Sequence, residues 1–288
     1  MSSAQVVTTE LRSWIVEQTQ LGHAAEQVLA SMLASGWDAA VAQRALLEAL
    51  DPAAGAALAE RPAAELSQAL PEPDLSGGHA LLWAGDREVK VLLTLARPRV
   101  VVFGGLLSDE ECDAMVALSA ARLARSETVA SAEYAEGVSE VNAARTSDGM
   151  FFERAENEVV RRVEARLALL LNWPAERGEG LQILHYRPGA EYLPHYDYFD
   201  PESASTPGIL LRGGQRLATI VMYLNTPAGG GATTFPDVGL EVQPIKGNAV
   251  FFSYDRPHPE TQSLHGGAPV REGEKWVATK WLRQGVFV

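Results

Sequence analysis

The sequence predicts an α+β protein whose C-terminal part is a sandwich or jelly-roll barrel of short β-strands, supported by a few helices. Two observations predict this fold. After Gly178, short β-type runs follow one another without helices between them, and turn sequences such as 229–231 and 246–248 separate the runs. Before them, segments 108–123 and 154–171 have helical periodicity, so we expect two helices that pack against one of the sheets.

Local signals place the individual elements. Ser108 and Glu111 have the spacing of a capping box, which begins the first helix. The second helix carries an apolar face and ends before Trp173-Pro174. The strands are predicted at Val89–Leu95, Val100–Phe103, Leu181–Tyr186, Tyr192–Phe199, Leu217–Leu224, Ala232–Phe235, Ala249–Tyr254 and Trp276–Leu282.

Three regions are expected along the chain. Residues 1–52 predict a small all-α region of three short helices, with apolar stripes that end near glycines such as Gly36. Residues 53–88 are rich in Ala, Pro, Gly and Glu, which predicts a linker-like connection. Residues 89–288 form the main domain. One interpretation is that the N-terminal helices dock on this domain. The other is that they contact a partner protein, because the turn at Gly36-Trp37 resembles that of ubiquitin-associated-type three-helix domains.

The overall charge argues against two classes of partner. The chain has 37 acidic and 24 basic residues, a formal net charge of −13, and no long basic run. Binding to nucleic acid or to an anionic membrane needs clustered Lys and Arg, so we expect neither. No apolar run approaches the ~18–20 residues that span a bilayer. Cys112 is the only cysteine and cannot form an internal disulfide, and the first ten residues lack the features of a secretory signal, so we expect a cytoplasmic protein.

His195 and Asp197 are the first candidates for chemistry. They lie two residues apart in a predicted strand, so both side chains point to the same face. An imidazole beside a carboxylate provides two of the three ligands of the 2-His-1-carboxylate facial triad that binds iron(II). A single His-x-Asp is common by chance, so this pattern predicts a metal site only if a third ligand is found elsewhere in the chain. His265 is the candidate; the rival His258 lies between two prolines in what looks like an exposed loop.

Lys275 is the second element of this constellation. It lies ten residues after His265, where a predicted hairpin returns, and shares one strand face with Val277, Thr279 and Trp281. An ammonium group that points into the metal cavity suits the distal carboxylate of a dicarboxylate cosubstrate. The alternative is an ordinary surface lysine on a hairpin. The presence of the three metal-binding side chains favours the cosubstrate role.

Four motifs carry a family resemblance. They are Leu181–Phe199, which contains His195-Tyr196-Asp197; Gly214–Asn225; Gly229–Pro236; and Ser263–Leu282, which contains His265 and Lys275. In this order and with these internal spacings, they resemble the catalytic core of prolyl 4-hydroxylases, which are iron(II)- and 2-oxoglutarate-dependent dioxygenases. The resemblance covers about residues 96–288 and most tightly 181–283. It implies a double-stranded β-helix, the jelly-roll form of the predicted barrel.

The resemblance also implies roles for individual residues. His195, Asp197 and His265 would bind Fe(II). Lys275 would bind 2-oxoglutarate, with help from the hydroxyl groups of Tyr186 and Thr219. Trp281 would line the metal cavity. Tyr192 and Arg145 match positions that line the peptide groove.

The implied reaction is hydroxylation of an unactivated carbon, with 2-oxoglutarate and O2 as cosubstrates and with ascorbate to restore oxidised iron. The resemblance favours prolyl residues of a peptide or protein as the substrate. Loop 201–214 is of the kind that covers substrate, but it has no clear match in the family. Three alternatives stay open: a free amino acid or other small molecule as substrate, a non-catalytic binding module, and a cupin-like protein that binds zinc or manganese.

Overall fold

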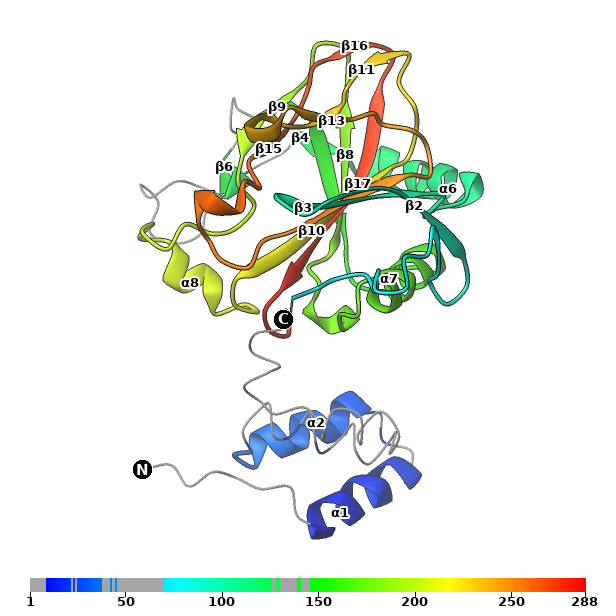
Figure 1. Ribbon diagram of the computed structural model, residues 1–288. Helices are drawn as coiled ribbons and strands as arrows, with labels where there is room; N and C mark the ends of the chain where they lie inside the picture. The colour runs from blue at the N-terminus through cyan, green and yellow to red at the C-terminus, as the bar shows by residue number, and fades with distance from the viewer. Residues whose placement is uncertain are drawn as a thin grey trace. The chain divides into compact units, whose positions relative to one another are not determined.

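The chain divides into two units, Met1–Ala69 and Leu70–Val288 (Figure 1). The computed structural model describes residues 9–21, 23, 25–37, 42, 45, 70–125, 128–129, 139–140 and 146–288. Among these residues, antiparallel sheets and a few helices form an α+β fold, as the sequence predicts. None of the described helices is both long and apolar enough to cross a membrane.

The N-terminal unit contains two described helices, α1 (Thr9–Gln20) and α2 (Ala25–Ala34). Gly36 follows α2 with a φ of 85°, the left-handed conformation in which glycine often ends a helix. The third predicted helix lies mostly outside the described residues. The core of the unit consists of buried apolar side chains: Leu11, Ile15, Val28, Met32, Ala42 and Ala45.

A nine-stranded antiparallel sheet forms the framework of the main unit, in the order β1-β2-β3-β14-β10-β17-β8-β7-β4. Near its middle, β17 pairs with β10 on one side and with β8 on the other. Because side chains alternate along a strand, each strand presents one set of residues to either side of the sheet. The strands are β1 (Leu81–Trp83), β2 (Glu88–Leu95), β3 (Arg99–Gly104), β4 (Ala124–Arg125), β7 (Asp148–Phe152), β8 (Leu181–Tyr186), β10 (Arg216–Tyr223), β14 (Ala249–Ser253) and β17 (Lys275–Arg283).

A smaller sheet, in the order β13-β12-β15-β9, packs on the large one. Phe235 and Val242 of the small sheet share a buried apolar core with Phe252 and Val277 of the large sheet. The space between the two sheets is therefore the interior of the main unit. The strands of the small sheet are β9 (Tyr192–His195), β12 (Thr233–Phe235), β13 (Leu240–Val242) and β15 (His265–Gly267). Two further pairs are β11 (Gly229–Gly230) with β16 (Val270–Glu272), and β5 (Thr128–Val129) with β6 (Ser139–Glu140).

Two helices pack on the outer face of the large sheet, the face turned away from the small sheet (Figure 1). Helix α6 (Asp109–Ser119) begins with the predicted capping box, in which Ser108 and Glu111 each accept a hydrogen bond from the other's backbone N–H. Helix α7 (Glu158–Leu170) begins at Asn157, whose side chain accepts from two backbone N–H groups. Shorter helical turns are α8 (Thr206–Leu210), η1 (Ala120–Arg122), η2 (Ala175–Arg177), η3 (Pro236–Val238) and η4 (Pro259–Thr261).

Buried ion pairs hold these helices in place. Arg166 of α7 donates to both carboxylate oxygens of Glu111 at 2.8 Å. Lys280, on the outer face of β17, donates to Glu164 of α7. Burial is costly for a charge unless the charge is paired, and both pairs meet that condition. The helices are therefore bound to the scaffold by charge as well as by apolar packing.

Several predicted boundaries were wrong. Residues 70–88 were predicted as linker, but they contain β1 and belong to the main unit: the Glu72 side chain pairs with Arg99 and accepts a hydrogen bond from Ser253. Helix α7 begins at Glu158 and not near 154, because Ala155 adopts a left-handed turn with a φ of 55°. Strand β16 pairs with β11, so the hairpin predicted before Lys275 does not form.

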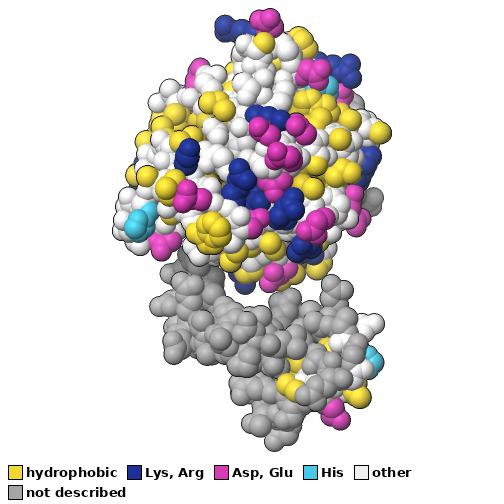
Figure 2. Space-filling view, turned by 90° about the vertical axis from the view of Figure 1, so that its right-hand side faces the viewer, with side chains coloured by type: hydrophobic (Ala, Val, Ile, Leu, Met, Phe, Trp, Pro, Cys, Tyr) yellow, Lys and Arg dark blue, Asp and Glu magenta, His cyan; other side chains and the backbone are white. Residues whose placement is uncertain are grey.

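The surface of the main unit carries both signs of charge. Figure 2 shows acidic and basic side chains interspersed on one face, without a continuous basic patch there.

Candidate active site

Three side chains converge between the sheets at the end of β9. His195 is the last residue of β9, Asp197 follows it, and His265 is the first residue of β15. Strands β9 and β15 pair with His265 directly opposite His195. One ligand atom from each side chain lies within 4.8 Å of the other two. The Nε2 atoms of His195 and His265 are 3.5 and 3.4 Å from the two carboxylate oxygens of Asp197.

The sequence predicted that these three residues lie together, but the reason it gave for His195 and Asp197 was wrong. β9 ends at His195, and Asp197 lies in the bend that follows, so strand alternation does not align the two side chains. Other contacts orient the carboxylate instead. The hydroxyl of Thr219 donates to Asp197 Oδ2 at 2.7 Å, and the guanidinium of Arg216 donates to the backbone oxygen of Asp197 at 3.3 Å.

The two imidazoles present the same nitrogen to the centre. His195 Nδ1 lies 2.9 Å from the carbonyl oxygen of Leu193, and His265 Nδ1 lies 3.0 Å from that of Ser263. A carbonyl oxygen only accepts hydrogen bonds, so each Nδ1 carries the proton and each Nε2 keeps a free lone pair. Such backbone contacts fix the tautomer of metal-binding histidines.

Burial also sets the protonation states. Burial lowers the pKa of His265 to about 4, so this imidazole is neutral at physiological pH. For Asp197 burial alone would raise the pKa, but His265, His195 and Arg216 together hold it well below its usual range. Two imidazole nitrogens and one carboxylate oxygen face a common point. This donor set fits iron(II) with open coordination positions, and zinc or manganese by donor type alone.

Lys275 lies in the same interior. It is the first residue of β17, is 4% exposed, and is the cross-strand partner of Tyr186. Its Nζ lies 5.3 and 5.9 Å from the ring centres of Tyr186 and Tyr223, and a Cβ added to Gly267, on the strand of His265, would meet it at 3.8 Å. Within the described part of the chain, Lys275 forms no ion pair with a carboxylate. Burial lowers its pKa to about 8.

The predicted 2-oxoglutarate contacts separate into two groups. Tyr186 lies beside Lys275, as described above. Thr219 does not: it pairs with Trp281, six residues along β17 from Lys275, which is roughly 20 Å along an extended strand. The Thr219 hydroxyl contacts Asp197 and lies 3.1 Å from the hydroxyl of Tyr254. The structure therefore places Thr219 as a support for the Asp197 carboxylate.

Two further predicted residues border the metal-binding side chains. The Tyr192 ring stacks on the His195 ring with centres 3.7 Å apart. Trp281 is buried, and its indole N–H has no hydrogen-bond partner among the described residues. Arg145, the other predicted groove residue, lies outside the described residues. Part of loop 201–214 forms the short helix α8.

Sequence reasoning missed a buried ion pair behind the site. Arg216 donates to both carboxylate oxygens of Glu179 at 2.7 and 2.9 Å, and its guanidinium lies 4.0 Å from the Trp281 ring. A charged residue at the start of a strand usually faces solvent, so the sequence alone did not mark Arg216. The rival ligand His258 is exposed and uses Nδ1 to accept from the backbone of Glu260.

Comparisons with known proteins agree with this site. Residues 181–283 match the family model of the 2OG-Fe(II) oxygenase superfamily, and they contain all three converging side chains and Lys275. Fold and site thus define an iron(II)- and 2-oxoglutarate-dependent oxygenase. Probable prolyl 4-hydroxylase 6 of Arabidopsis thaliana is 41% identical over 210 residues, covering 66% of this chain and 70% of that protein. Prolyl 4-hydroxylase 1 of the same plant is 38% identical over 228 residues, covering 70% and 77%. The chain belongs to the prolyl 4-hydroxylase family.

Among solved structures, the chain is similar to the viral collagen prolyl hydroxylase of Paramecium Bursaria Chlorella virus-1 in its 2OG complex. The two are 29% identical, with a TM-score of 0.49, and the match covers 64% of this chain and 94% of the viral one. A prolyl-4-hydroxylase of Pseudomonas putida matches with 20% identity and a TM-score of 0.42, covering 64% and 91%.

Proposed function

We propose that this oxygenase hydroxylates prolyl residues of a peptide or protein. The observation that carries the proposal is the combination of His195, Asp197 and His265 around one point with the buried, unpaired Lys275 in the same interior. Relatives that are about 40% identical and named prolyl 4-hydroxylases support the choice of substrate.

In this proposal the three converging side chains hold Fe(II). His195 and His265 supply Nε2 lone pairs, and Asp197 supplies an anionic oxygen that the Thr219 hydroxyl orients. The bound iron, with 2-oxoglutarate and O2, supplies the oxidising power that inserts one oxygen atom into a C–H bond while 2-oxoglutarate becomes succinate and CO2. The protein keeps the other coordination positions open and dry.

Lys275 binds the cosubstrate in this scheme. Its ammonium group pairs with the far carboxylate of 2-oxoglutarate through a charge-assisted hydrogen bond, and Tyr186 lies beside it. A buried cation without a carboxylate partner gains most from an incoming anion, because the anion compensates the cost of burial. This contact orients 2-oxoglutarate toward the metal.

The two facing sheets support a finer description of the fold. We propose that the small sheet and the central strands of the large sheet are the two layers of a double-stranded β-helix. Their shared apolar core and the position of the metal-binding side chains between them support this description.

The peptide substrate is favoured over a free amino acid by the surroundings of the metal-binding group. Tyr192 stacks on His195 with ring centres 3.7 Å apart, which puts an aromatic surface beside the metal-binding group where it can cover part of a bound peptide. A binding module without turnover is disfavoured, because all three metal-binding side chains and Lys275 are present in one interior.

Three accessory expectations remain predictions. Ascorbate is proposed as the reductant that restores iron after turnover without substrate, on the basis of the family alone. Contact of the N-terminal helices with a partner protein and the cytoplasmic location rest on the sequence alone.

The test measures product directly. Purified protein is incubated with Fe(II), ascorbate, 2-oxoglutarate and a proline-rich peptide, and the peptide mass and succinate are followed. We expect a gain of one oxygen atom on the peptide and an equal amount of succinate. The matched control is the same peptide with alanine in place of proline, which stays unmodified. Succinate formation with free proline, and none with peptides, would overturn the peptide assignment.

A further inference from the structure

Asn225, the last residue of the motif Gly214–Asn225, lies where the chain leaves the large sheet after β10. The pairing with β17 continues for one residue past the end of β10, because the backbone N–H of Leu224 donates to the carbonyl oxygen of Trp276 at 2.9 Å. The same antiparallel register, extended by one more residue, puts Asn225 opposite Lys275. Asn225 is therefore the cross-strand neighbour of the proposed cosubstrate lysine.

The side-chain amide of Asn225 bonds the backbone on both sides of Lys275. Its Nδ2 donates to the carbonyl oxygen of Glu274 at 2.8 Å, and its Oδ1 accepts from the backbone N–H of Trp276 at 2.7 Å. A side-chain amide has a carbonyl oxygen and an NH₂ group, so it can replace a peptide group of a neighbouring strand. Asn225 thus continues the sheet hydrogen bonds of β17 at the point where the backbone of β10 turns away.

Lys275 depends on such contacts because it is the first residue of β17. Gly273, two residues earlier, has a φ of 77°, so the chain enters the strand from a turn. The ends of secondary-structure elements open more easily than their middles. On the side of β8, Lys275 pairs with Tyr186. With Tyr186 on that side and Asn225 on the other, both neighbouring strands hold the start of β17.

The packing of the Lys275 stem couples its backbone to its ammonium group. A Cβ added to Gly231 would meet Lys275 Cδ at 3.1 Å, so the stem lies close to the backbone of that glycine. In a close-packed interior, a side chain has little room to compensate a shift of its own backbone. A displacement of the start of β17 therefore moves the Nζ atom relative to the rings of Tyr186 and Tyr223.

We infer that Asn225 is a positioning residue for the cosubstrate. It holds the backbone on both sides of Lys275 and thereby sets where the ammonium group meets the far carboxylate of 2-oxoglutarate. A binding group has to be held within about 0.5 Å of its productive position to act at full strength. The inference rests on the proposed role of Lys275 and adds a residue that acts through it.

The experiment measures binding of 2-oxoglutarate directly. Calorimetry under anaerobic conditions gives the Kd for the Fe(II)-loaded protein and for its Asn225→Ala variant. We expect Kd to rise about threefold to tenfold in the variant, since one net hydrogen bond changes an equilibrium constant by about fivefold. KM for 2-oxoglutarate should rise by the same factor, while kcat changes by less than about twofold. The iron content should stay the same, because Asn225 contacts none of the metal-binding side chains.

The double variant Asn225→Ala/Lys275→Met shows whether the effect passes through the lysine. Lys275→Met alone should raise Kd by a larger factor than Asn225→Ala. Once the ammonium group is absent, Asn225 has nothing to position, so adding Asn225→Ala to Lys275→Met should leave Kd unchanged. An increase that multiplies undiminished in the double variant would overturn the inference.

Asn157→Ala is the matched control. Asn157 also makes two side-chain hydrogen bonds to the backbone, but it does so at the start of α7, on the outer face of the large sheet. The variant should lower stability and leave Kd for 2-oxoglutarate unchanged. A rise in Kd as large as that of Asn225→Ala would show that any loss of stability weakens binding, and would overturn the inference.

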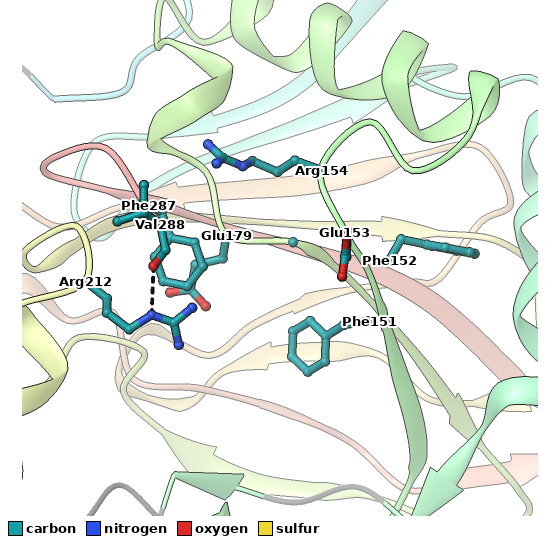
Figure 3. A pocket seen from close by; sticks show the side chains of 9 residues that line it. Phe151, Phe152, Glu153, Arg154, Glu179, Arg212, Phe287 and Val288 are labelled. Atoms are coloured by element: carbon teal, nitrogen blue, oxygen red, sulfur yellow. Dashed lines mark hydrogen bonds between the residues drawn. The ribbon is translucent and has the colours of Figure 1, made fainter. Parts of the chain in front are cut away.

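A second control lies at the opposite end of β8 from Lys275. Figure 3 shows Arg154 in the lining of a cavity that also includes Gly180, the residue before β8. Arg154 donates to the backbone oxygen of Glu176 at 2.8 Å, the same length as the bond from Asn225 to Glu274. Arg154→Ala removes this bond and should also leave Kd unchanged.

Asn225→Ser is measured beside Asn225→Ala, so that the test does not depend on the folding of one variant. A serine side chain lacks the amide and is too short to bridge the two backbone groups, so Kd should rise in the same way. Unchanged Kd in the folded Asn225 variants, together with a raised Kd in Lys275→Met, would overturn the inference and leave the proposed function intact. Unchanged Kd in Lys275→Met, or no 2-oxoglutarate turnover by the Fe(II)-loaded protein, would overturn the proposed function itself.

Discussion

Two lysines on one strand show how differently the two faces of the large sheet are used. Lys275 and Lys280 both lie on β17 and are both buried, with 4% and 2% of their surface exposed. Five residues separate them, so they point to opposite faces. Lys280 faces α7 and pairs with Glu164. Lys275 faces the interior between the sheets, where its described neighbours are the rings of Tyr186 and Tyr223.

The difference teaches how to tell a structural charge from a functional one. A buried charge is tolerated when a partner compensates it, and the outer lysine meets that condition within the protein. The inner lysine has no carboxylate partner among the described residues, and the rings of Tyr186 and Tyr223 compensate only part of the cost of burying its charge. Burial without a carboxylate partner therefore supports the proposed role of Lys275 in binding the cosubstrate. The inner face should control activity, and the outer face should control stability.

The largest effect is expected at the metal-binding group itself. His195→Ala removes one of two nitrogen ligands, and we expect loss of iron binding and of 2-oxoglutarate turnover by more than about 100-fold, since even supporting residues of metal ligands contribute about 10–100-fold. The iron content after anaerobic loading measures iron binding, and the rate of succinate formation measures 2-oxoglutarate turnover. The melting temperature of the metal-free protein should change little. Unchanged iron uptake would contradict the role of His195.

On the outer face we expect a substitution to reduce stability and to leave turnover unchanged. Lys280→Met leaves Glu164 buried and unpaired, which should lower the free energy of unfolding by about 3–5 kcal/mol. Denaturant unfolding measures this loss. Turnover per folded molecule should stay near the unsubstituted value. In the double variant Lys280→Met/Glu164→Leu, much of the stability should return, because no buried charge is left without a partner.

Lys275→Met is the matched substitution on the inner face. Loss of one charge-assisted contact to 2-oxoglutarate should raise KM for the cosubstrate by about 10- to 150-fold, the equivalent of about 1.5–3 kcal/mol. The stability of the ligand-free protein should be equal or greater, because an uncompensated buried charge is removed. A loss of stability as large as that of Lys280→Met would show that the contrast between the two faces is wrong.

A smaller effect is expected from pH. Burial lowers the pKa of Lys275 to about 8, so the ammonium form is present below that pH and is lost above it. KM for 2-oxoglutarate should therefore be constant below about pH 7 and rise up to about tenfold per pH unit above pH 8. Initial rates at several pH values test this. The Lys275→Met variant serves as the control, in which the rise should be absent.

Local patterns in the sequence were enough to predict the long elements. β8 spans Leu181–Tyr186 as predicted, because an apolar β-type run there ends at Pro188-Gly189. The capping box at Ser108 also has the predicted form. β7 was missed, because Asp148–Phe152 is short and begins with two residues that disfavour strands. The start of α7 was misplaced, because nothing in the local pattern reveals the left-handed turn at Ala155.

Predicting the candidate site required the pairing of strands that are far apart in the chain, and local sequence patterns do not contain that information. The register that puts His265 opposite His195 joins strands far apart in the chain, so it is a property of the tertiary fold. Family resemblance supplied that pairing. The same limit explains the misplacement of Thr219: its strand was predicted correctly, but its partner is the Asp197 carboxylate, which reaches it from a bend after β9.

The pairing of β9 with β15 has a consequence for how the molecule responds to iron supply. Each strand is only three or four residues long, and strands this short contribute little pairing energy by themselves. An ion held by His195 and His265 would tether them and close a loop of about 70 residues. By mass action, iron availability then sets how firmly the small sheet stays folded as well as how many molecules are active.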